Sequence, residues 1–355
     1  MKLKSIIASI TVVLALAVSG YAQHVITSGG TYTYADGDSI SINTTQPVTL
    51  YHCTVISNAS EIVNCIAGAQ ITIEDSTFKY NGSTPSQVIW LVQPATVQVH
   101  NCYVDGGSGV GSDGIFIYGP CPGEIYVSNN CVNNCAFPIV VYNCKSNPSI
   151  YITWNQITGD AQTPRNDQIS VLESSGTPPD HLIYIYENFV ECDPDAKNVP
   201  DGTGINGSDQ GCAYVDVDSC TVENGNYGGI TFYYGNGNTS VLQNSLCRGI
   251  GGLNPANYSG GISFGHTGDT QAGYCYNTQC GWWNPAIGAE LNFYPEKLHA
   301  INGNSGIGKE QITLANEQAD YQNWLTAASK AGQTIGDPRG GNPSPTWPDP
   351  SDFNF

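Results

Sequence analysis

The stretch Val48-Thr49-Leu50-Tyr51-His52-Cys53-Thr54-Val55 decides the fold, because its pattern returns along nearly the whole chain of 355 residues. The pattern is apolar, any, apolar, any two, small and polar, any, apolar. Further copies begin at Ile71, Val97, Ile125, Ile150, Ile183, Val215, Thr239 and Ala272, with a degenerate copy near Ile301. The sixth position holds Cys53, Ser76, Cys102, Asn130, Asn155, Asn188, Cys220, Asn244, Asn277 and Asn304, which follow one another at 23 to 33 residues. Such a period predicts a solenoid.

The alternation of apolar residues within each copy is typical of β-strands, and Asn or Cys at the sixth position suits a bend of the chain. Neighbouring coils of a β-helix lie about 4.8 Å apart. We therefore expect Asn130, Asn155 and Asn188 to hydrogen-bond to one another in an interior ladder. A second strand follows each motif, as at 115–117 and 139–141. The predicted fold is all-β: a single-domain parallel β-helix of about ten coils, with two strands in each coil.

The 13 cysteines are best interpreted by their place in the repeat. Their odd number and wide spacing do not fit a small disulfide-stapled scaffold. Cys53 and Cys102 are two coils apart in the predicted stack, roughly 10 Å, which is too far for a disulfide bond. Cys247 and Cys280 each follow a sixth-position Asn by three residues, and they are expected either to pair or to stack.

The ends of the chain differ from the repeat. Residues 1–22 have the build of a signal peptide, with Lys2 and Lys4 followed by an apolar run and small residues, which predicts a secreted protein, extracellular or periplasmic. Residues 23–335 form the predicted β-helix domain with its end cap, an amphipathic helix over 310–331 that is stopped by Gly332 and covers the last coil. Residues 336–355 form a Pro-rich tail, either a strap along the solenoid or a loose end.

The formal charge of −19 limits the partners. Nucleic acids and anionic membranes are held by Lys and Arg, so we expect no nucleic-acid partner and no membrane insertion. We expect the protein to be a monomer. No cofactor is required by the motifs present, although the acidic loop 193–201 is a candidate for Ca²⁺.

The signal segment, the coil length, the Asn ladder and the terminal helix together resemble the pectate-lyase-like superfamily of right-handed parallel β-helices, over roughly residues 24–335. The resemblance implies a right-handed coil and a carbohydrate partner, and leaves open hydrolysis, elimination, epimerisation and adhesion. The chain departs from the polygalacturonase pattern, since it has no Asp-Asp pair, no Arg-x-Lys, and only Gly265-His266-Thr267.

Outward positions of the second strands predict a column of aromatic rings. Such rings stack on the apolar faces of sugars, and a row spaced by coils suits a linear glycan. The alternative is that they cover neighbouring coils. The predicted substrate-binding residues are Phe116, Tyr118, Tyr142, Glu173, Tyr233 and Tyr234, with Trp90 as an addition to the column.

Carboxylates flank this column at strand ends. Glycoside hydrolysis uses two carboxyl groups, about 5 Å apart for retention and roughly 6.5–9.5 Å apart for inversion, and stacked coils allow Asp113 with Asp167, or Asp167 with Asp209. The predicted catalytic residues are Asp113, Arg165, Asp167, Asp209, His266 and Glu290. The alternatives are a surface ion pair for Arg165 and a loop hydrogen bond for His266.

Because acids are plentiful and bases scarce, the sequence favours hydrolysis of a polysaccharide on a lateral groove. A non-catalytic glycan-binding or adhesin-type solenoid is the first alternative, because it needs the aromatic column but no paired carboxylates. A polysaccharide lyase is the second alternative, because elimination needs a base and a cation beside the uronate carboxylate.

Overall fold

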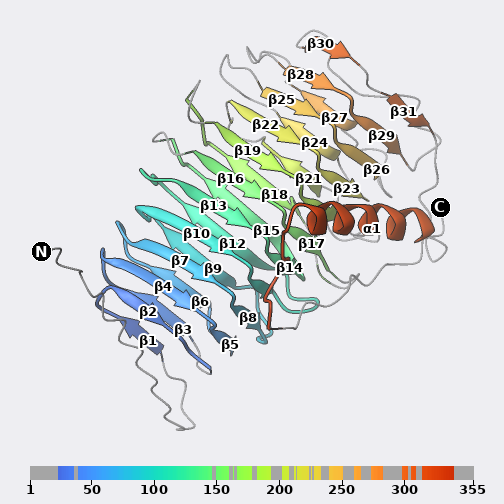
Figure 1. Ribbon diagram of the computed structural model, residues 1–355. Coiled ribbons are helices and arrows are strands. Elements are labelled where there is room, and N and C mark those ends of the chain that lie inside the picture. Colours follow the sequence, from blue (N-terminus) through green and yellow to red (C-terminus); the bar gives the residue numbers. More distant parts are fainter. Residues whose placement is uncertain are drawn as a thin grey trace, which may run out of the picture.

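The computed structural model forms three long parallel sheets, which wind around a common interior (Figure 1). It describes residues 23–35, 39–145, 149–159, 163, 166–177, 182–192, 202–207, 212, 214–223, 225, 228–232, 240–250, 260–264, 273–282, 298–302, 305–308 and 314–339.

Successive strands of the chain join sheets A, B and C in turn, and every described pair of neighbours in a sheet is parallel. Sheet A contains β1 (Gln23–Ile26), β3 (Ser39–Ile42), β6 (Glu61–Cys65), β9 (Gln87–Val92), β12 (Ser112–Tyr118), β15 (Cys135–Tyr142), β18 (Ile169–Leu172), β21 (Thr203–Asn206), β24 (Gly228–Phe232) and β27 (Gly260–Phe264). Sheet B contains β2 (Gly30–Tyr32), β4 (Pro47–Tyr51), β7 (Gln70–Glu74), β10 (Thr96–His100), β13 (Ile125–Ser128), β16 (Ile150–Thr153), β19 (Ile183–Tyr186), β22 (Val215–Asp218), β25 (Ser240–Gln243), β28 (Gly273–Tyr276) and β30 (Leu298–Asn302). Sheet C contains β5 (Thr54–Ser57), β8 (Thr77–Tyr80), β11 (Tyr103–Asp105), β14 (Cys131–Asn133), β17 (Gln156–Thr158), β20 (Phe189–Glu191), β23 (Thr221–Glu223), β26 (Leu246–Ile250), β29 (Gln279–Trp282) and β31 (Ser305–Gly308).

The predicted parallel β-helix is confirmed, but the prediction of two strands per coil is wrong. Each repeat motif forms two strands, one in sheet B and one in sheet C. The fifth motif position separates them, because its residue has a positive φ that turns the chain. Examples are His52 at 55°, Asp75 at 49° and Trp154 at 57°.

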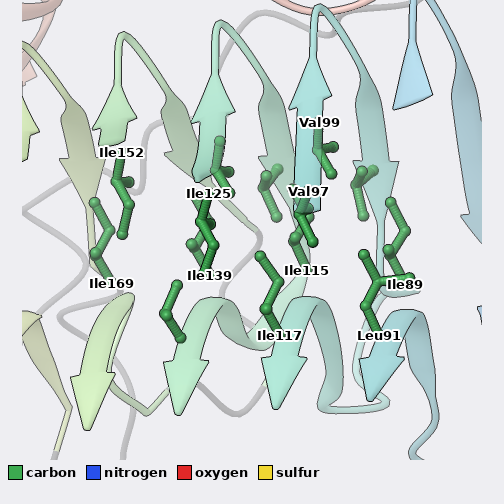
Figure 2. Packing of buried hydrophobic residues seen from close by; sticks show 14 of the residues in the cluster. Ile89, Leu91, Val97, Val99, Ile115, Ile117, Ile125, Ile139, Ile152 and Ile169 are labelled. Carbon is green, nitrogen blue, oxygen red and sulfur yellow. The ribbon is translucent and has the colours of Figure 1, made fainter. Parts of the chain in front are cut away.

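The interior is filled by the apolar motif positions. Val97, Val99, Ile115 and Ile117 are completely buried, and the side chains of sheets A and B meet across the interior (Figure 2). Register pairing places each apolar residue beside its equivalent in the next coil, as with Ile125 and Ile150. The repeat in the sequence therefore becomes continuous apolar rows.

The Asn ladder is confirmed for Asn130, Asn155 and Asn188, which are completely buried. Asn130 Nδ2 donates to Asn155 Oδ1 at 3.0 Å, and Asn155 Nδ2 donates to Asn188 Oδ1 at 3.0 Å. The ladder continues through Cys220, whose backbone N–H donates to Ser245 Oγ at 3.1 Å.

Two ladder assignments are wrong. Asn244 and Asn277 lie one residue earlier, at the positive-φ bend, and both are exposed. The two copies that we began at Thr239 and Ala272 are therefore displaced by one residue. The two copies were displaced because Asn is favourable both at a left-handed bend and in the interior ladder, so the residue type alone does not separate the two positions.

Cys53 and Cys102 are free thiols, as expected. Burial raises the pKa of Cys53 to about 11 and that of Cys102 further still, so both behave as small apolar side chains. Cys247 and Cys280 are neighbours in register.

Helix α1 (Leu314–Lys330) forms at the predicted place in the chain and ends before Gly332, whose φ is 71°. It does not cover the last coil. It lies instead along the outer face of sheet C (Figure 1). Tyr321 Oη donates to Gln156 Oε1 at 2.9 Å, and Trp324 Nε1 donates to the Glu187 carbonyl at 2.7 Å. The apolar face of the helix thus packs beside Phe189 in the middle coils.

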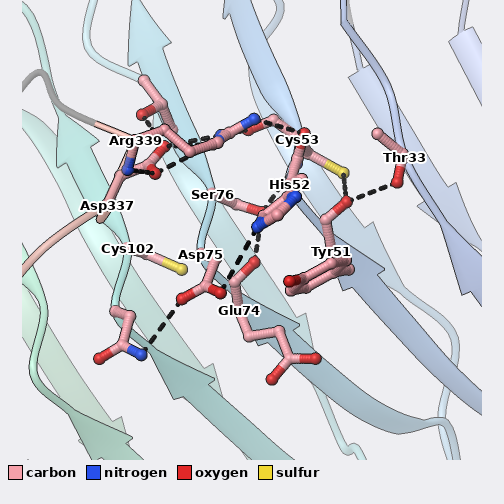
Figure 3. A network of polar contacts seen from close by, with 12 residues as sticks. Thr33, Tyr51, His52, Cys53, Glu74, Asp75, Ser76, Cys102, Asp337 and Arg339 are labelled. Carbon is pink, nitrogen blue, oxygen red and sulfur yellow. Dashed lines mark hydrogen bonds and ion pairs between the residues drawn. The ribbon is translucent and has the colours of Figure 1, made fainter.

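The segment after α1 is a strap that runs back toward the N-terminal coils (Figure 1). Asn129 Nδ2 donates to Gln333 Oε1 at 2.8 Å. Arg339 donates to the carbonyls of His52 and Cys53, each at 2.7 Å, and pairs with buried Asp337 (Figure 3). Burial acts to raise the pKa of Asp337, but hydrogen bonds from Arg339 and Thr77 outweigh it and hold the pKa below its usual range. The described part of the tail, 336–339, is therefore a strap.

Candidate functional site

The predicted aromatic column exists on the outer face of sheet A, at the same register positions of consecutive coils. Phe116 pairs with Trp90, and Tyr118 pairs with Tyr142. The ring centroids are 4.5 Å apart for Trp90 and Phe116 and 5.2 Å apart for Tyr118 and Tyr142. We call these four half-buried residues the sheet A column.

Rings in the same register row of the sheet A column are tilted against each other, whereas the diagonal neighbours Trp90 and Tyr118 are nearly parallel, at 9° with centroids 6.4 Å apart. The interplanar angle is 46° between Trp90 and Phe116 and 44° between Tyr118 and Tyr142. Tilted neighbours do not cover each other's faces, so part of each π-face stays available for the apolar side of a sugar ring. The column can therefore act as a stacking surface.

The column ends after three coils. The positions in line with Trp90 and Phe116 in the next coils hold Val140, Ser170, Asn206 and Thr231, which are at most 3% exposed. Among the residues that the structure describes, the open aromatic surface of sheet A is thus limited to β9, β12 and β15.

Glu173 lies at the end of the column and is held by two donors. Tyr142 Oη donates to Glu173 Oε1 at 3.0 Å, and Lys145 Nζ contacts Oε2 at 2.8 Å. The hydrogen bond from Lys145, followed by that from Tyr142, lowers the pKa of Glu173 below its ordinary value. Glu173 is therefore an ionised hydrogen-bond acceptor beside the rings. Its negative charge is paired with the positive charge of Lys145.

Asp113 lies at the start of β12, in register with Gln87 of β9. Gln87 Nε2 donates to Asp113 Oδ2 at 3.4 Å. Burial raises the pKa of Asp113 to about 6, and the hydrogen bond from Gln87 offsets part of that effect. A carboxyl group that keeps its proton in mildly acidic solution is suited to act as a general acid.

Asp167 has a different environment at the same edge of sheet A. Its Oδ1 accepts a hydrogen bond from the Thr203 N–H at 3.1 Å, and its Oδ2 accepts one from Asn206 Nδ2. Donors of this kind favour the charged carboxylate. The sequence reasoning did not identify these partners, because they lie one coil away across a loop of variable length.

Register places the two carboxylates on one edge of the sheet. Ile139 pairs with Ile115 on one side and with Ile169 on the other. Asp113 and Asp167 each lie two residues earlier, so they flank Phe137 and are two coils, about 9.6 Å, apart in the backbone. This backbone separation is slightly larger than the roughly 6.5–9.5 Å found between the carboxyl groups of an inverting pair.

The other predicted site residues lie outside the described residues. They are Arg165, Asp209, Tyr233, Tyr234, His266 and Glu290. The pair Asp167 with Asp209 stays a prediction, and so does the acidic loop 193–201 as a Ca²⁺ site. Among the residues that the structure does describe, no group of three or more His, Cys, Asp or Glu side chains could hold a metal ion.

Sheet B carries a second aromatic row that the sequence reasoning missed. Tyr126, Tyr151 and Tyr184 occupy the middle of successive Ile-Tyr-Val and Ile-Tyr-Ile triplets, which was an available signal. Their ring centroids are 4.6 and 4.9 Å apart, with interplanar angles of 3° and 12°. Because these rings are nearly parallel, their faces cover one another. This sheet B ladder therefore stabilises the stack of coils and offers a ligand mainly ring edges.

The comparisons with known proteins agree with the fold. A family model described as a right-handed beta helix region matches residues 13–159. No curated protein and no solved structure matches the chain. The match spans less than half of the chain, and together with the three parallel sheets it shows a right-handed parallel β-helix, which is consistent with the pectate-lyase-like architecture. In the described part of the chain, no helix has both the length and the apolar character needed to cross a membrane.

Proposed function

We propose that this chain is a secreted protein that binds a polysaccharide along the sheet A column. The observation that carries the proposal is the set of four half-buried rings on three consecutive coils, tilted within each register row. Right-handed β-helices often act on or bind carbohydrates, which supports the class of partner but not a particular one. A linear glycan along the axis of the solenoid would meet a ring in each of these coils.

The charge of the protein favours a neutral glycan over a polyanion. The formal charge is −19. Lys145, the cation described at the end of the column, is bound by Glu173. A uronate-rich chain would therefore meet net repulsion, with no free positive partner among the side chains described at this end of the column. The proposed ligand class is a neutral or weakly charged polysaccharide.

Replacing Tyr118 with Ala tests this surface against the rest of the solenoid. We expect the affinity for a neutral oligosaccharide to fall about two- to thirteenfold, since an aromatic contact contributes roughly 0.5–1.5 kcal/mol. Titration calorimetry against a panel of neutral and uronate glycans measures the loss. Tyr151→Ala in the sheet B ladder is the matched control, with unchanged affinity expected. Loss of affinity only in Tyr151→Ala, or no binding by the wild type to any glycan, would refute the proposal.

Hydrolysis of the bound glycan is a second candidate function, favoured by the unlike environments of Asp113 and Asp167. Asp113 would protonate the leaving oxygen, and Asp167 would activate a water molecule on the opposite face of the sugar. This acid–base chemistry requires no cofactor. Elimination is less well supported, because Lys145 is occupied by Glu173.

A further inference from the structure

A row of bend residues runs along the corner where the chain leaves sheet A, beside the sheet A column. It holds Gln93, Gly119, Asn143 and Glu173, each of which directly follows a residue paired in register with its neighbour in the next coil. All four have a positive φ, between 47° and 86°. We call these four residues the corner row. Because they follow one another coil by coil, they form a line parallel to the column.

Gly119 leaves room for the side chain of Gln93. A Cβ atom at position 119 would lie 2.8 Å from Gln93 Cγ, well inside the roughly 3.5–4.0 Å at which carbon atoms make favourable contact. Gln93, Asn143 and Glu173 take the same bend with side chains present, so the bend itself does not require glycine. The missing side chain at 119 therefore lets Gln93 lie across the next coil, over the residue that follows Tyr118.

Each tyrosine of the column consequently has an amide beside it. Gln93 reaches the coil of Tyr118, and Asn143 directly follows Tyr142. Gln93 is exposed and Asn143 is half-buried, so a ligand can reach both. An amide donates and accepts hydrogen bonds, as a sugar hydroxyl does. The two amides are thus placed to bind the hydroxyl groups of sugars whose rings lie on the tyrosines.

The apolar half of this surface continues along the same line. Val92 and Leu172 flank Tyr118 and Tyr142 in one register row. Ile66 extends the row by one coil, because it follows a strand that is in register with β9, and it is 42% exposed. The surface therefore has an apolar strip beside a polar row. A pyranose has the same division, with C–H groups on its faces and hydroxyl groups around its edge.

The spacing of the coils selects an extended glycan. Neighbouring coils lie about 4.8 Å apart, and a chain of pyranose rings linked through equatorial bonds at C1 and C4 advances by nearly the same distance with each sugar. Such a chain is a flat ribbon with apolar faces and hydroxyl-bearing edges. An α-1,4-linked glucan coils instead, so its successive sugars cannot follow a straight row of rings.

We propose that the sheet A column and the corner row together bind a neutral β-1,4-linked glycan of the glucan, mannan or xylan type in its extended form, with one sugar for each coil. The rings of the glycan lie on the column, and one of its edges contacts the amides of Gln93 and Asn143. This inference rests on the proposed binding of a glycan to the column and narrows the class of that glycan. Gln93 and Asn143 are its specificity-determining residues.

Calorimetric titration of the full chain with oligosaccharides of increasing length tests the ligand class. We expect the affinity for cello-, manno- or xylo-oligosaccharides to rise with each added sugar until the chain spans the coils of the corner row, and then to level off. Malto-oligosaccharides of equal length should bind about tenfold more weakly, since each lost ring contact or hydrogen bond lowers the affinity by a factor of about two to thirteen.

Two variants test the corner row itself. Gln93→Met keeps an unbranched side chain of similar length but removes the amide, so the affinity for the β-linked oligosaccharide should fall about two- to thirteenfold. Gly119→Ala should cause a similar loss, because its Cβ displaces Gln93. Gln98→Met, the same substitution at an exposed position of β10 in sheet B, is the matched control and should keep the wild-type affinity. An unchanged midpoint of urea unfolding in Gln93→Met separates the loss of binding from misfolding.

Three results would overturn the inference. They are equal affinity for malto-oligosaccharides and β-linked oligosaccharides, an affinity that does not change with length, and wild-type affinity in Gln93→Met. Each of them is compatible with a loss of binding in Tyr118→Ala, which would still support a glycan on the column. The absence of binding to any glycan would refute the proposed function together with this inference.

Discussion

Replacing Asp113 with Asn is expected to lower the rate of glycan hydrolysis by roughly 10²- to 10⁴-fold, the usual contribution of a general acid. Asn has nearly the same shape and can still contact Gln87, but it has no proton to give to the leaving oxygen. The affinity for the glycan should change little, because the rings of the sheet A column are untouched. Reducing-end release by the wild type and the variant measures the effect.

The pH profile of the wild type gives an independent check on Asp113. A general acid works only while protonated, and burial raises the pKa of Asp113 to about 6. We therefore expect kcat/KM to fall above about pH 6. Glu61→Gln is the matched control and should keep the wild-type rate and pH profile. Glu61 lies in the same register row of sheet A as Gln87 and Asp113, one coil before Gln87. A full rate in Asp113→Asn, or no decline above pH 6, would remove hydrolysis by this pair and leave binding as the function.

Replacing Asn155 with Ala should destabilise the fold by about 3 kcal/mol. Asn155 Oδ1 accepts from both the backbone N–H and Nδ2 of Asn130, at 3.1 and 3.0 Å, and its Nδ2 donates to the Val127 carbonyl at 2.9 Å. The substitution leaves these buried groups without partners, and each such group costs about 1–3 kcal/mol before relaxation. The shift in the midpoint of urea unfolding measures the loss.

Asn244→Ala is the control for the ladder. Asn244 is exposed, and its side chain contacts Asp218 rather than an interior amide. It also has a positive φ of 50°, so we expect a loss of about 1 kcal/mol from backbone strain alone. Equal stability losses in the two variants would show that the interior ladder has no special role.

The coil and the aromatic column could be predicted because both follow from local alternation. Once Ile115 and Ile117 point inward, Phe116 and Tyr118 must point outward. The third sheet could not be predicted in the same way. The bend that creates it depends on a positive φ, and His52, Trp154 and Glu187 occupy that bend as well as Asn. The residue types at the bend therefore do not identify it.

The rest of the site depends on contacts between distant parts of the chain. The apolar stripe of α1 predicts a buried face but not the surface that buries it, which is decided by Tyr321 with Gln156 and Trp324 with Glu187. Likewise, the hydrogen bonds that hold the Asp167 carboxylate come from Thr203 and Asn206, which lie 36 and 39 residues later in the chain. Because the loops vary in length, the repeat period of the sequence does not show which residues are such partners.

The central claim is that stacked coils present one aromatic wall to a polysaccharide, and a crystal structure with a bound neutral oligosaccharide tests it most directly. The account predicts a sugar chain along the axis of the solenoid across β9, β12 and β15, with a pyranose ring against Tyr118. An oligosaccharide seated on the sheet B ladder, with the sheet A column bare, would contradict it.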